Sequence, residues 1–376
     1  GIDWQQSDHL IRFLKDNHVD LVVVGPEAPL VAGLADVLNK AGIPVFGPSK
    51  VAAQLEGSKV FAKDLMKKYN IPTAAYGVFH KVDEAKEFIA QTGAPIVVKA
   101  DGLAAGKGVV VAMTIEEANA AVEDMLSGNR FGDAGSTVVI EEFMEGEEAS
   151  LLAFVDGKTV VPMIASQDHK RIYDGDKGPN TGGMGTYAPA PVLTDALRDE
   201  AMKTILEPMV AAMEKEGMPY VGCLYAGLMI TSQGPKVVEF NARFGDPETQ
   251  VVLPLLDSDL GQIMMACATG TLTANMVKWK DSSAVCVILA SKGYPETSSK
   301  GDVIHGDIKQ HDTTIVFHSG TKLVGDEYVT NGGRVLGVVG LGKDLRTALD
   351  RAYGRIEHID FEGMQYRTDI GAKAFK

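Results

Sequence analysis

Residues 237–250 carry the sequence VVEFNARFGDPETQ, which combines an apolar run with a cluster of polar and charged residues. It begins as an apolar run that passes into alternation, which predicts a strand leaving the core. Alternation places Glu239 and Asn241 on one face of that strand, with Arg243 next on the same face. A carboxylate and an amide oxygen suit Mg²⁺ or Mn²⁺, which also take phosphate oxygens from a nucleotide. We therefore predict a metal site at Glu239 and Asn241, with the Arg243 guanidinium directed at phosphate.

The second part of the stretch predicts a sharp change of direction. Asp246 and Pro247 should stop the strand, and Glu248 should fall in the first turn of the next helix. For any one of these residues, a strand end with solvated charges is the alternative interpretation.

The run RFGDPETQ, from Arg243 to Gln250, resembles the signature of the phosphoribosylamine–glycine ligase family, also called glycinamide ribonucleotide synthetases. That family belongs to the ATP-grasp superfamily, and the similarity extends over nearly the whole chain. The resemblance implies a fold of the α/β and α+β classes. It would combine an ATP-grasp core, a partial N-terminal parallel α/β domain and a small C-terminal α+β domain.

The bulk composition of the 376 residues excludes several classes of protein. The chain is 45% hydrophobic and 23% charged, as expected for a soluble globular protein of two or three domains. A net charge of -14 argues against a nucleic-acid partner, so anionic substrates would need a locally positive cleft. Three cysteines are too few for a disulfide framework, which favours the cytoplasm. No signal peptide and no apolar run of ~18 residues is present, so we expect no membrane association.

The N-terminal region predicts a β-α-β unit. A helix at residues 8–18 precedes a buried strand at 21–25, a helix to about residue 41 and a strand at 44–47. No G-x-G-x-x-G follows the first strand, which excludes a dinucleotide fold. The resemblance implies that an earlier strand and glycine-rich turn of this domain are missing. We then expect an exposed strand edge, normal ATP binding, poor use of phosphoribosylamine, and aggregation or pairing through that edge.

A helix is predicted from about residue 50 to residue 69, and Lys59 lies within it. An ordinary surface lysine is the simplest interpretation of Lys59 by itself. The resemblance instead implies that Lys59 reaches the nucleotide phosphates.

A glycine-rich loop, ADGLAAGKG at residues 100–108, lies between two predicted strands, and Lys99 ends the first of them. Glycines let backbone N–H groups approach phosphates closely. The spacing and the strand that follows exclude a P-loop, and a glycine hairpin turn is the alternative. The resemblance implies a lid over the γ-phosphate that includes Gly106, Lys107 and Gly108, with Lys99 on the α- and β-phosphates.

The acidic run EEFMEGEE at residues 141–148 follows a predicted strand. Such a run is normally a solvated turn. The resemblance implies a hinge at which backbone groups of Glu141, Glu142 and Phe143 recognise adenine. Glu148 would bind the ribose hydroxyls, and Glu147 remains the open alternative.

Residues 166–186 form the longest polar, glycine-rich segment, and a loop of this length in a compact domain is functional or disordered. The resemblance places the amino acid and the sugar phosphate here, with substrate contacts from Asn180, Thr181, Gly182 and Gly183. It also implies catalytic roles for Arg243, Asp246 and Asp168. His169 is a weak catalytic candidate, because a loop histidine usually lies at the surface. Arg334, beside two glycines, is assigned to substrate phosphate, and a surface arginine is the alternative.

The rest of the chain predicts further regular elements. A helix at about residues 194–216 leads to a strand at 221–230. After the strand that begins at residue 237, helices are predicted at about 248–256 and 259–269. Short strands begin near residue 283, and a helix covers about 343–358. The predicted domains are residues 1–72, the nucleotide lid at 73–145, the central domain at 146–278 and the C-terminal domain at 279–376.

The resemblance implies a monomeric enzyme that uses ATP and Mg²⁺ or Mn²⁺ to join glycine to 5-phosphoribosylamine. A glycyl phosphate would form first, and glycinamide ribonucleotide, ADP and phosphate would be the products. Phosphoryl transfer of this kind needs positioning and charge neutralisation rather than a cysteine or serine nucleophile. Two alternatives remain: another ATP-grasp ligase, such as a carboxylating enzyme, and a non-catalytic nucleotide-binding protein.

Overall fold

The computed structural model describes residues 1–104, 108–128 and 131–376, and its strands form separate sheets in two units. The first unit comprises Gly1–Met163, Asp195–Phe244 and Ser258–Val277. The second comprises Ile164–Thr194, Gly245–Asp257 and Lys278–Lys376. The boundaries of the four domains proposed from the sequence remain predictions.

The first unit opens with a parallel pair of strands. β1 (Val22–Val23) pairs with β2 (Val45–Phe46), which confirms the predicted β-α-β order. The helices around this pair are α1 (Ser7–Asp16), α2 (Glu27–Ala32) and α3 (Leu34–Lys40). The predicted single connecting helix is broken at Gly33, whose φ of +97° is a left-handed conformation that favours glycine.

The prediction of one helix over residues 50–69 was wrong. Two helices form instead, α4 (Gln54–Gly57) and α5 (Lys59–Lys68). Ser58 between them is extended, with φ of −140°, and its Oγ accepts a hydrogen bond from the Phe61 N–H at 3.1 Å. Ser58 is therefore the N-cap that restarts the helix.

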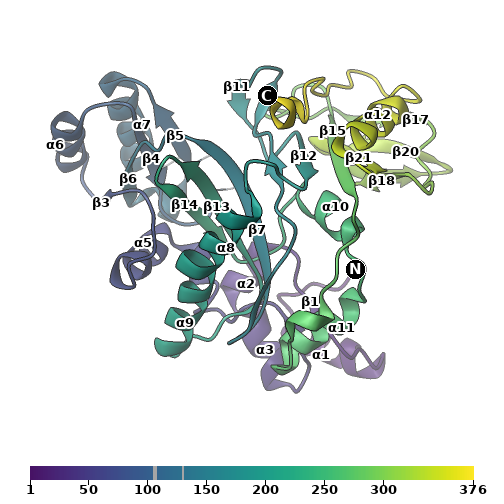
Figure 1. Ribbon diagram of the computed structural model, residues 1–376, viewed down its shortest axis with the longest axis horizontal. Coiled ribbons are helices and arrows are strands. Elements are labelled where there is room, and N and C mark those ends of the chain that lie inside the picture. The colour runs from purple at the N-terminus through teal and green to yellow at the C-terminus, as the bar shows by residue number, and fades with distance from the viewer. Residues whose placement is uncertain (105–107, 129–130) are drawn as a thin grey trace. The chain divides into compact units, whose positions relative to one another are not determined.

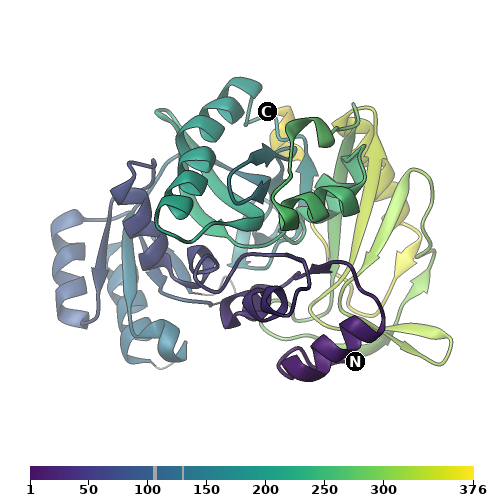
Figure 2. The ribbon, with the colours of Figure 1, turned by 90° about the horizontal axis from the view of Figure 1, so that it is seen from below.

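An antiparallel sheet with two helices on one face follows. Its strand order is β3-β6-β4-β5, with bounds β3 (Tyr76–Phe79), β4 (Ile96–Ala100), β5 (Val109–Ala112) and β6 (Val138–Glu142). The helices α6 (Val82–Thr92) and α7 (Ile115–Ser127) lie side by side in Figure 1 and Figure 2. Their buried apolar residues share one core with the sheet. A short 3₁₀ turn, η1 (Gly132–Gly135), precedes β6.

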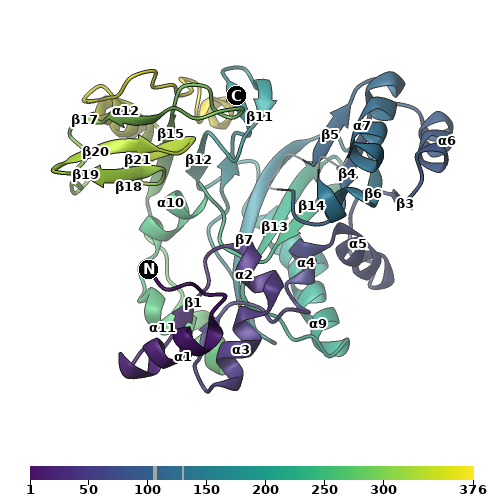
Figure 3. The same ribbon diagram turned by 180° about the vertical axis from the view of Figure 1, so that it is seen from behind.

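The second sheet of this unit contains residues 237–241, the first part of the VVEFNARFGDPETQ stretch. Its order is β14-β13-β7-β8, with bounds β7 (Glu147–Asp156), β8 (Val160–Pro162), β13 (Val221–Thr231) and β14 (Gly234–Asn241), and β13 and β14 lie together in Figure 3. The antiparallel β7–β8 pair confirms the hairpin at residues 156–157. A bridge between Thr73 and Val237 links the chain before β3 to β14.

The helices associated with this sheet are α8 (Asp195–Ala201), α9 (Glu207–Lys215) and α11 (Leu260–Thr269), with a short 3₁₀ turn η4 (Ala274–Met276). The predicted helix at residues 194–216 is present. Its middle, η2 (Met202–Leu206), is π-helical, so it is not one regular α-helix.

The second unit is built on a five-stranded antiparallel sheet of order β18-β21-β15-β12-β9. The bounds are β9 (Gln167–Asp168), β12 (Gly185–Ala188), β15 (Ser283–Ala290), β18 (Thr314–His318) and β21 (Arg334–Gly342). The smaller sheets of the unit use β10 (Arg171–Tyr173), β11 (Lys177–Asn180), β16 (Lys300–Val303), β17 (His305–Gly306), β19 (Thr321–Val324), β20 (Glu327–Asn331) and β22 (Ile359–Asp360). Its helices are α10 (Thr249–Val252), η3 (Leu253–Leu255), α12 (Leu345–Ile356) and η5 (Ala372–Phe375).

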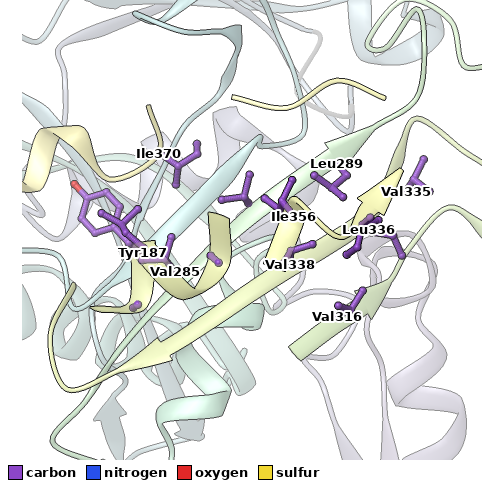
Figure 4. Close-up of a cluster of buried hydrophobic side chains, with 14 of the residues drawn as sticks. Tyr187, Val285, Leu289, Val316, Val335, Leu336, Val338, Ile356 and Ile370 are labelled. Carbon is purple, nitrogen blue, oxygen red and sulfur yellow. The ribbon is translucent and has the colours of Figure 1, made fainter. Parts of the chain in front are cut away.

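The two faces of this five-stranded sheet differ in character. One face forms the apolar core in Figure 4, where Tyr187, Val285 and Val338 pack with Ile356 of α12. The other face carries Cys286 and lies under α10. Among the helices of the described residues, none has the length and apolar character needed to cross a bilayer.

Candidate functional site

Glu239 and Asn241 lie on one face of β14, as the alternation predicted. Glu239 is opposite Gly227 in β13, and a Cβ on Gly227 would lie 3.4 Å from Glu239 Cγ. The glycine thus leaves room for the carboxylate over the sheet. β14 ends at Asn241, so the alternation does not extend to Arg243, and the prediction that Arg243 continues this face was wrong.

The donor set at this strand end fits a metal ion that shares its ligands with a nucleotide. Glu239 offers a carboxylate and Asn241 an amide oxygen. The described residues contain no group of three or more His, Cys, Asp and Glu side chains that could hold a metal. Because Mg²⁺ is usually held by one or two carboxylates together with waters and substrate phosphates, two protein ligands are sufficient.

A buried cluster of two lysines and one glutamate lies beside β14. Glu141 Oε1 is 3.3 Å from Lys63 Nζ, and Glu141 Oε2 is 3.0 Å from Lys99 Nζ. Lys99 Nζ also donates a hydrogen bond to the Val238 carbonyl in β14 at 3.1 Å. All three charged residues are less than 5% exposed. Two ammonium groups and one carboxylate leave one net positive charge, which favours binding of an anion.

Lys63 is a functional candidate that the sequence analysis missed. Its Nζ also donates to Thr73 Oγ1 at 2.7 Å and to the Ala74 carbonyl at 3.3 Å. Burial lowers the pKa of Lys63 to about 8, although the Glu141 carboxylate opposes the shift. The sequence did contain one indication of this role, because Lys63 lies one helical turn after Lys59 and therefore on the same face of the helix.

Lys59 is not an ordinary surface lysine. It is half-buried, and its Nζ donates to the Gly102 carbonyl at 2.9 Å. Asp101 Oδ1 accepts the backbone N–H groups of Lys59 and Val60 at 2.6 and 3.2 Å, so this carboxylate caps α5. Burial lowers the pKa of Lys59, and the Glu239 carboxylate opposes that shift. The start of the glycine-rich loop is therefore tied to α5.

The predicted lid is only partly described by the structure. Gly106 and Lys107 lie outside the described residues. The Gly108 carbonyl accepts the Ala100 N–H at 2.8 Å, which closes the base of the loop. A Cβ on Gly108 would lie 2.6 Å from the Ala104 Cβ, so a larger residue at position 108 would require Ala104 to shift.

The acidic run at residues 141–148 begins within β6 and ends in β7, and its charged side chains have different environments. The Glu141 side chain is buried against the lysines, so it offers a ligand only backbone groups. Glu142 is exposed and donates its N–H to the Ala75 carbonyl at 2.9 Å, while Phe143 is half-buried. Glu147 and Glu148 start β7 on opposite faces and are both exposed, so the choice between them for ribose stays open.

Arg243 is held between two acidic side chains. Its Nε is 2.9 Å from Glu27 Oε2, and its Nη2 is 3.1 Å from Glu56 Oε1. Glu56 Oε2 accepts the N–H of Ala242, the residue after Asn241, at 2.7 Å. Burial raises the pKa of Glu56 to about 7, although the Arg243 charge opposes the shift. Glu56, which sequence reasoning missed, therefore links α4 to the end of β14.

In the second unit, Asp168 lies at the end of β9 beside Gly183. A Cβ on Gly183 would be 2.9 Å from both Asp168 carboxyl oxygens and 2.5 Å from Pro247 Cδ. Asp168 Oδ1 is enclosed without a hydrogen-bond partner among the described residues. Burial raises the pKa of Asp168, and the buried Glu248 carboxylate raises it further. Two neighbouring carboxyl groups favour a cation.

Arg334 connects the glycine-rich segment at residues 166–186 to the RFGDPETQ run at residues 243–250. Its Nη1 donates to the Gly182 carbonyl at 3.0 Å and to the Asp246 carbonyl at 2.9 Å. Its Nη2 lies 3.1 Å from Asp246 Oδ2. Arg334 is thus not a freely solvated arginine. Of the other residues assigned to the substrate, Thr181 donates its N–H to the Lys170 carbonyl at 2.7 Å, and Asn180 is exposed.

The expectation that His169 lies at the surface was wrong. Its side chain is 1% exposed, with Nδ1 2.9 Å from the Gly185 carbonyl and Nε2 accepting the Gly371 N–H at 3.4 Å. Burial lowers its pKa to about 4. His169 is therefore a neutral structural residue that links three segments.

Comparison with protein families matches three models along the chain. They are the phosphoribosylglycinamide synthetase N domain at residues 1–56, its ATP-grasp (A) domain at 57–249 and its C domain at 284–373. Phosphoribosylamine–glycine ligase of Neisseria meningitidis serogroup A is 54% identical over 377 residues, which cover 100% of this chain and 89% of that protein. The ligase of Halalkalibacterium halodurans is 53% identical over 374 residues, covering 100% and 87%.

Two solved structures extend the comparison to the fold. The crystal structure of phosphoribosylamine–glycine ligase from Thermotoga maritima matches with a TM-score of 0.79 and 38% identity, covering 87% of this chain and 82% of that chain. Biotin carboxylase from Campylobacter jejuni, in complex with β,γ-ATP, matches with a TM-score of 0.77 and 15% identity, covering 96% and 79%. These matches confirm the predicted ATP-grasp fold.

Proposed function

Because the chain belongs to the phosphoribosylglycinamide synthetase family, we propose that it joins glycine to 5-phosphoribosylamine with conversion of ATP to ADP and phosphate. The product is glycinamide ribonucleotide, an intermediate of purine biosynthesis. The identity of more than half over the full chain does not favour the non-catalytic alternative. The likeness to biotin carboxylase, at 15% identity, concerns the fold alone.

The observation that carries this proposal in the first unit is the buried Lys63–Glu141–Lys99 cluster beside β14. Its net positive charge supports a site for the nucleotide phosphates, with Lys99 in contact with the α- and β-phosphates. Lys59 adds a further ammonium group near the glycine-rich loop. Glu239 and Asn241 would hold Mg²⁺ or Mn²⁺, which when bound neutralises phosphate charge.

The chemistry proceeds in two transfers. A carboxylate oxygen of glycine attacks the γ-phosphorus, the bond to the β-phosphate oxygen breaks, and ADP leaves. The amine of phosphoribosylamine then attacks the carbonyl carbon of the glycyl phosphate. Phosphate leaves, one proton is released, and the amide remains. Both steps depend on positioning and charge neutralisation.

The second unit supplies groups suited to the other two substrates. Asp168 and Glu248 form an acidic pair that would receive the ammonium group of glycine. Gly183 lies close against Asp168. A substrate amino acid larger than glycine would therefore find no room for its side chain beside this carboxyl group. The segment from Asn180 to Gly183, held by Arg334, would bind phosphoribosylamine.

The test is to supply ATP, Mg²⁺, glycine and freshly prepared phosphoribosylamine and to detect glycinamide ribonucleotide by mass. We expect product only when all three substrates are present. Omission of glycine separates this activity from that of a carboxylating enzyme, because phosphate release must stop without glycine. ATP binding with no product from the complete mixture would contradict the proposal.

A further inference from the structure

A fully buried arginine near the C-terminus holds a hairpin that is far away in sequence. Arg367 is 1% exposed, and its Nε and Nη2 donate to the two carboxylate oxygens of Asp369 at 2.7 and 2.8 Å. Its Nη1 donates to Asp176 Oδ1 at 2.9 Å and to the Arg171 carbonyl at 3.1 Å. The planar guanidinium thus bridges its own segment and the β10–β11 hairpin.

Further contacts attach the same C-terminal segment, Arg367–Lys373, to the turn of that hairpin. Lys373 Nζ is 2.8 Å from Asp176 Oδ2, and Asp369 Oδ2 accepts the Gly175 N–H at 2.9 Å. Thr368 donates its N–H to Asp174 Oδ1 at 2.9 Å. Each of the turn residues 174–176 is therefore held by the C-terminal segment.

Carboxylates compensate the buried positive charge of this network. Arg367 faces Asp176 and Asp369, and Lys373 also faces Asp176, so the buried guanidinium is paired within the protein. Burial opposes ionisation of Asp369, but its hydrogen bonds with Arg367 outweigh that effect and hold the pKa of Asp369 well below its usual range. Asp176 has a φ of +56°, a left-handed conformation that the network helps to maintain.

The hairpin has little apolar packing of its own. All four residues of β11 are exposed, and Ile172 is the buried apolar residue of β10. Polar contacts to Arg367–Lys373 must therefore supply much of its order. β11 ends at Asn180, and Thr181 Oγ1 then accepts the Gly183 N–H at 3.0 Å.

We propose that Arg367 is a positioning residue which, through Asp176 and Asp369, fixes the β10–β11 hairpin and with it the segment Asn180–Gly183. This inference rests on the proposed function, in which that segment binds phosphoribosylamine. Arg367 itself contacts no substrate. It acts through the hairpin, whose orientation sets the place of the residues that follow β11.

The experiment uses the full chain with Arg367→Lys and Asp176→Asn. Lysine keeps the charge but cannot form the fork, and asparagine keeps the size of aspartate but removes its charge. The matched control is Arg355→Lys, because Arg355 is also buried in this unit, with its Nη1 2.7 Å from Asp307 Oδ2. Hydrogen exchange over residues 171–181 and KM for each substrate are measured for every variant.

In both test variants we expect exchange over the hairpin to rise about tenfold, and KM for phosphoribosylamine to rise about tenfold with KM for ATP nearly unchanged. The control should leave both quantities as in the parent protein. Unchanged hairpin exchange, or faster exchange with an unchanged KM for phosphoribosylamine, would overturn the inference. If Arg367→Lys does not fold, Asp176→Asn decides alone. If the parent protein forms no product, the proposed function fails, and faster hairpin exchange would still support the role of Arg367 in ordering the hairpin.

Discussion

Lys63 Nζ lies 3.3 Å from Glu141 Oε1, and both side chains are about 3% exposed. Glu141 needs this partner, because a buried carboxylate is costly unless it is paired and hydrogen-bonded. Its second oxygen binds Lys99, so Lys63 helps to set the position of the lysine proposed to bind phosphate.

Replacement of Lys63 by Met should therefore weaken both stability and nucleotide use. We expect a loss of about 1–3 kcal/mol in the free energy of unfolding, since Glu141 keeps one of its two partners. KM for ATP should rise, because the Glu141 carboxylate would then pair with Lys99 only and would neutralise the positive charge proposed to bind phosphate. The control is Lys68→Met, because Lys68 forms a solvent-exposed ion pair with Glu216 and such pairs add little to stability. Urea unfolding and initial rates measure both effects, and equal results for the two variants would contradict the role of Lys63.

Replacement of Glu239 by Gln should abolish most activity and leave the fold intact. The change removes the charge of a proposed metal ligand but little volume, so turnover should fall by about 100-fold or more. The control is Glu207→Gln, at an exposed position in the first turn of α9. Turnover is measured with excess Mg²⁺ beside thermal unfolding, and parental turnover in Glu239→Gln would exclude this residue as a metal ligand.

His169 should make the stability of the fold depend on pH below neutrality. Its pKa is about 4 in the folded chain and 6.5 as the ordinary value, so between these values the unfolded chain binds more protons. The stability that this difference in pKa provides is fully present above pH 6.5 and is lost as the pH falls towards 4. It amounts to at most about 3 kcal/mol. Urea unfolding at pH 7.5 and pH 5 measures the free energy of unfolding. Between these pH values it should fall less for His169→Asn than for the parent protein, and equal decreases would show that His169 is not the group responsible.

Gly183 should not tolerate a side chain. Its φ is +122°, and a Cβ would lie 2.5 Å from Pro247 Cδ and 2.9 Å from the Asp168 oxygens. The control is Gly217→Ala, because Gly217 also has a positive φ but has no atom within 4 Å of its added Cβ. Backbone strain alone costs about 1–2 kcal/mol in the control. Gly183→Ala should cost more and should raise KM for glycine, and similar losses in both variants would mean that only φ matters.

Local patterns in the sequence predicted much of the fold, because the periods of strands and helices are local properties. The alternation at residues 237–241 placed Glu239 and Asn241 on one face, and the glycines at 102–108 marked a loop between two strands. Breaks in helices were missed where one residue decided them, as at Ser58 and Gly33. At these positions the capping bond or the left-handed backbone outweighs the helical pattern of the neighbours.

The sequence by itself determined the family, the ATP-grasp fold and the candidate metal ligands, since these rest on contiguous motifs and a period of two. Only the tertiary structure decided which charged side chains lie together. Lys63 reaches Glu141 from a different element, and Arg367 reaches Asp176 across 191 positions. Nothing local distinguishes such residues from solvated ones, because their ionic partners are brought near only when the sheets and helices pack. The buried members of these pairs, Lys63, Glu141 and Arg367, need their partners because an unpaired charge in the core is costly.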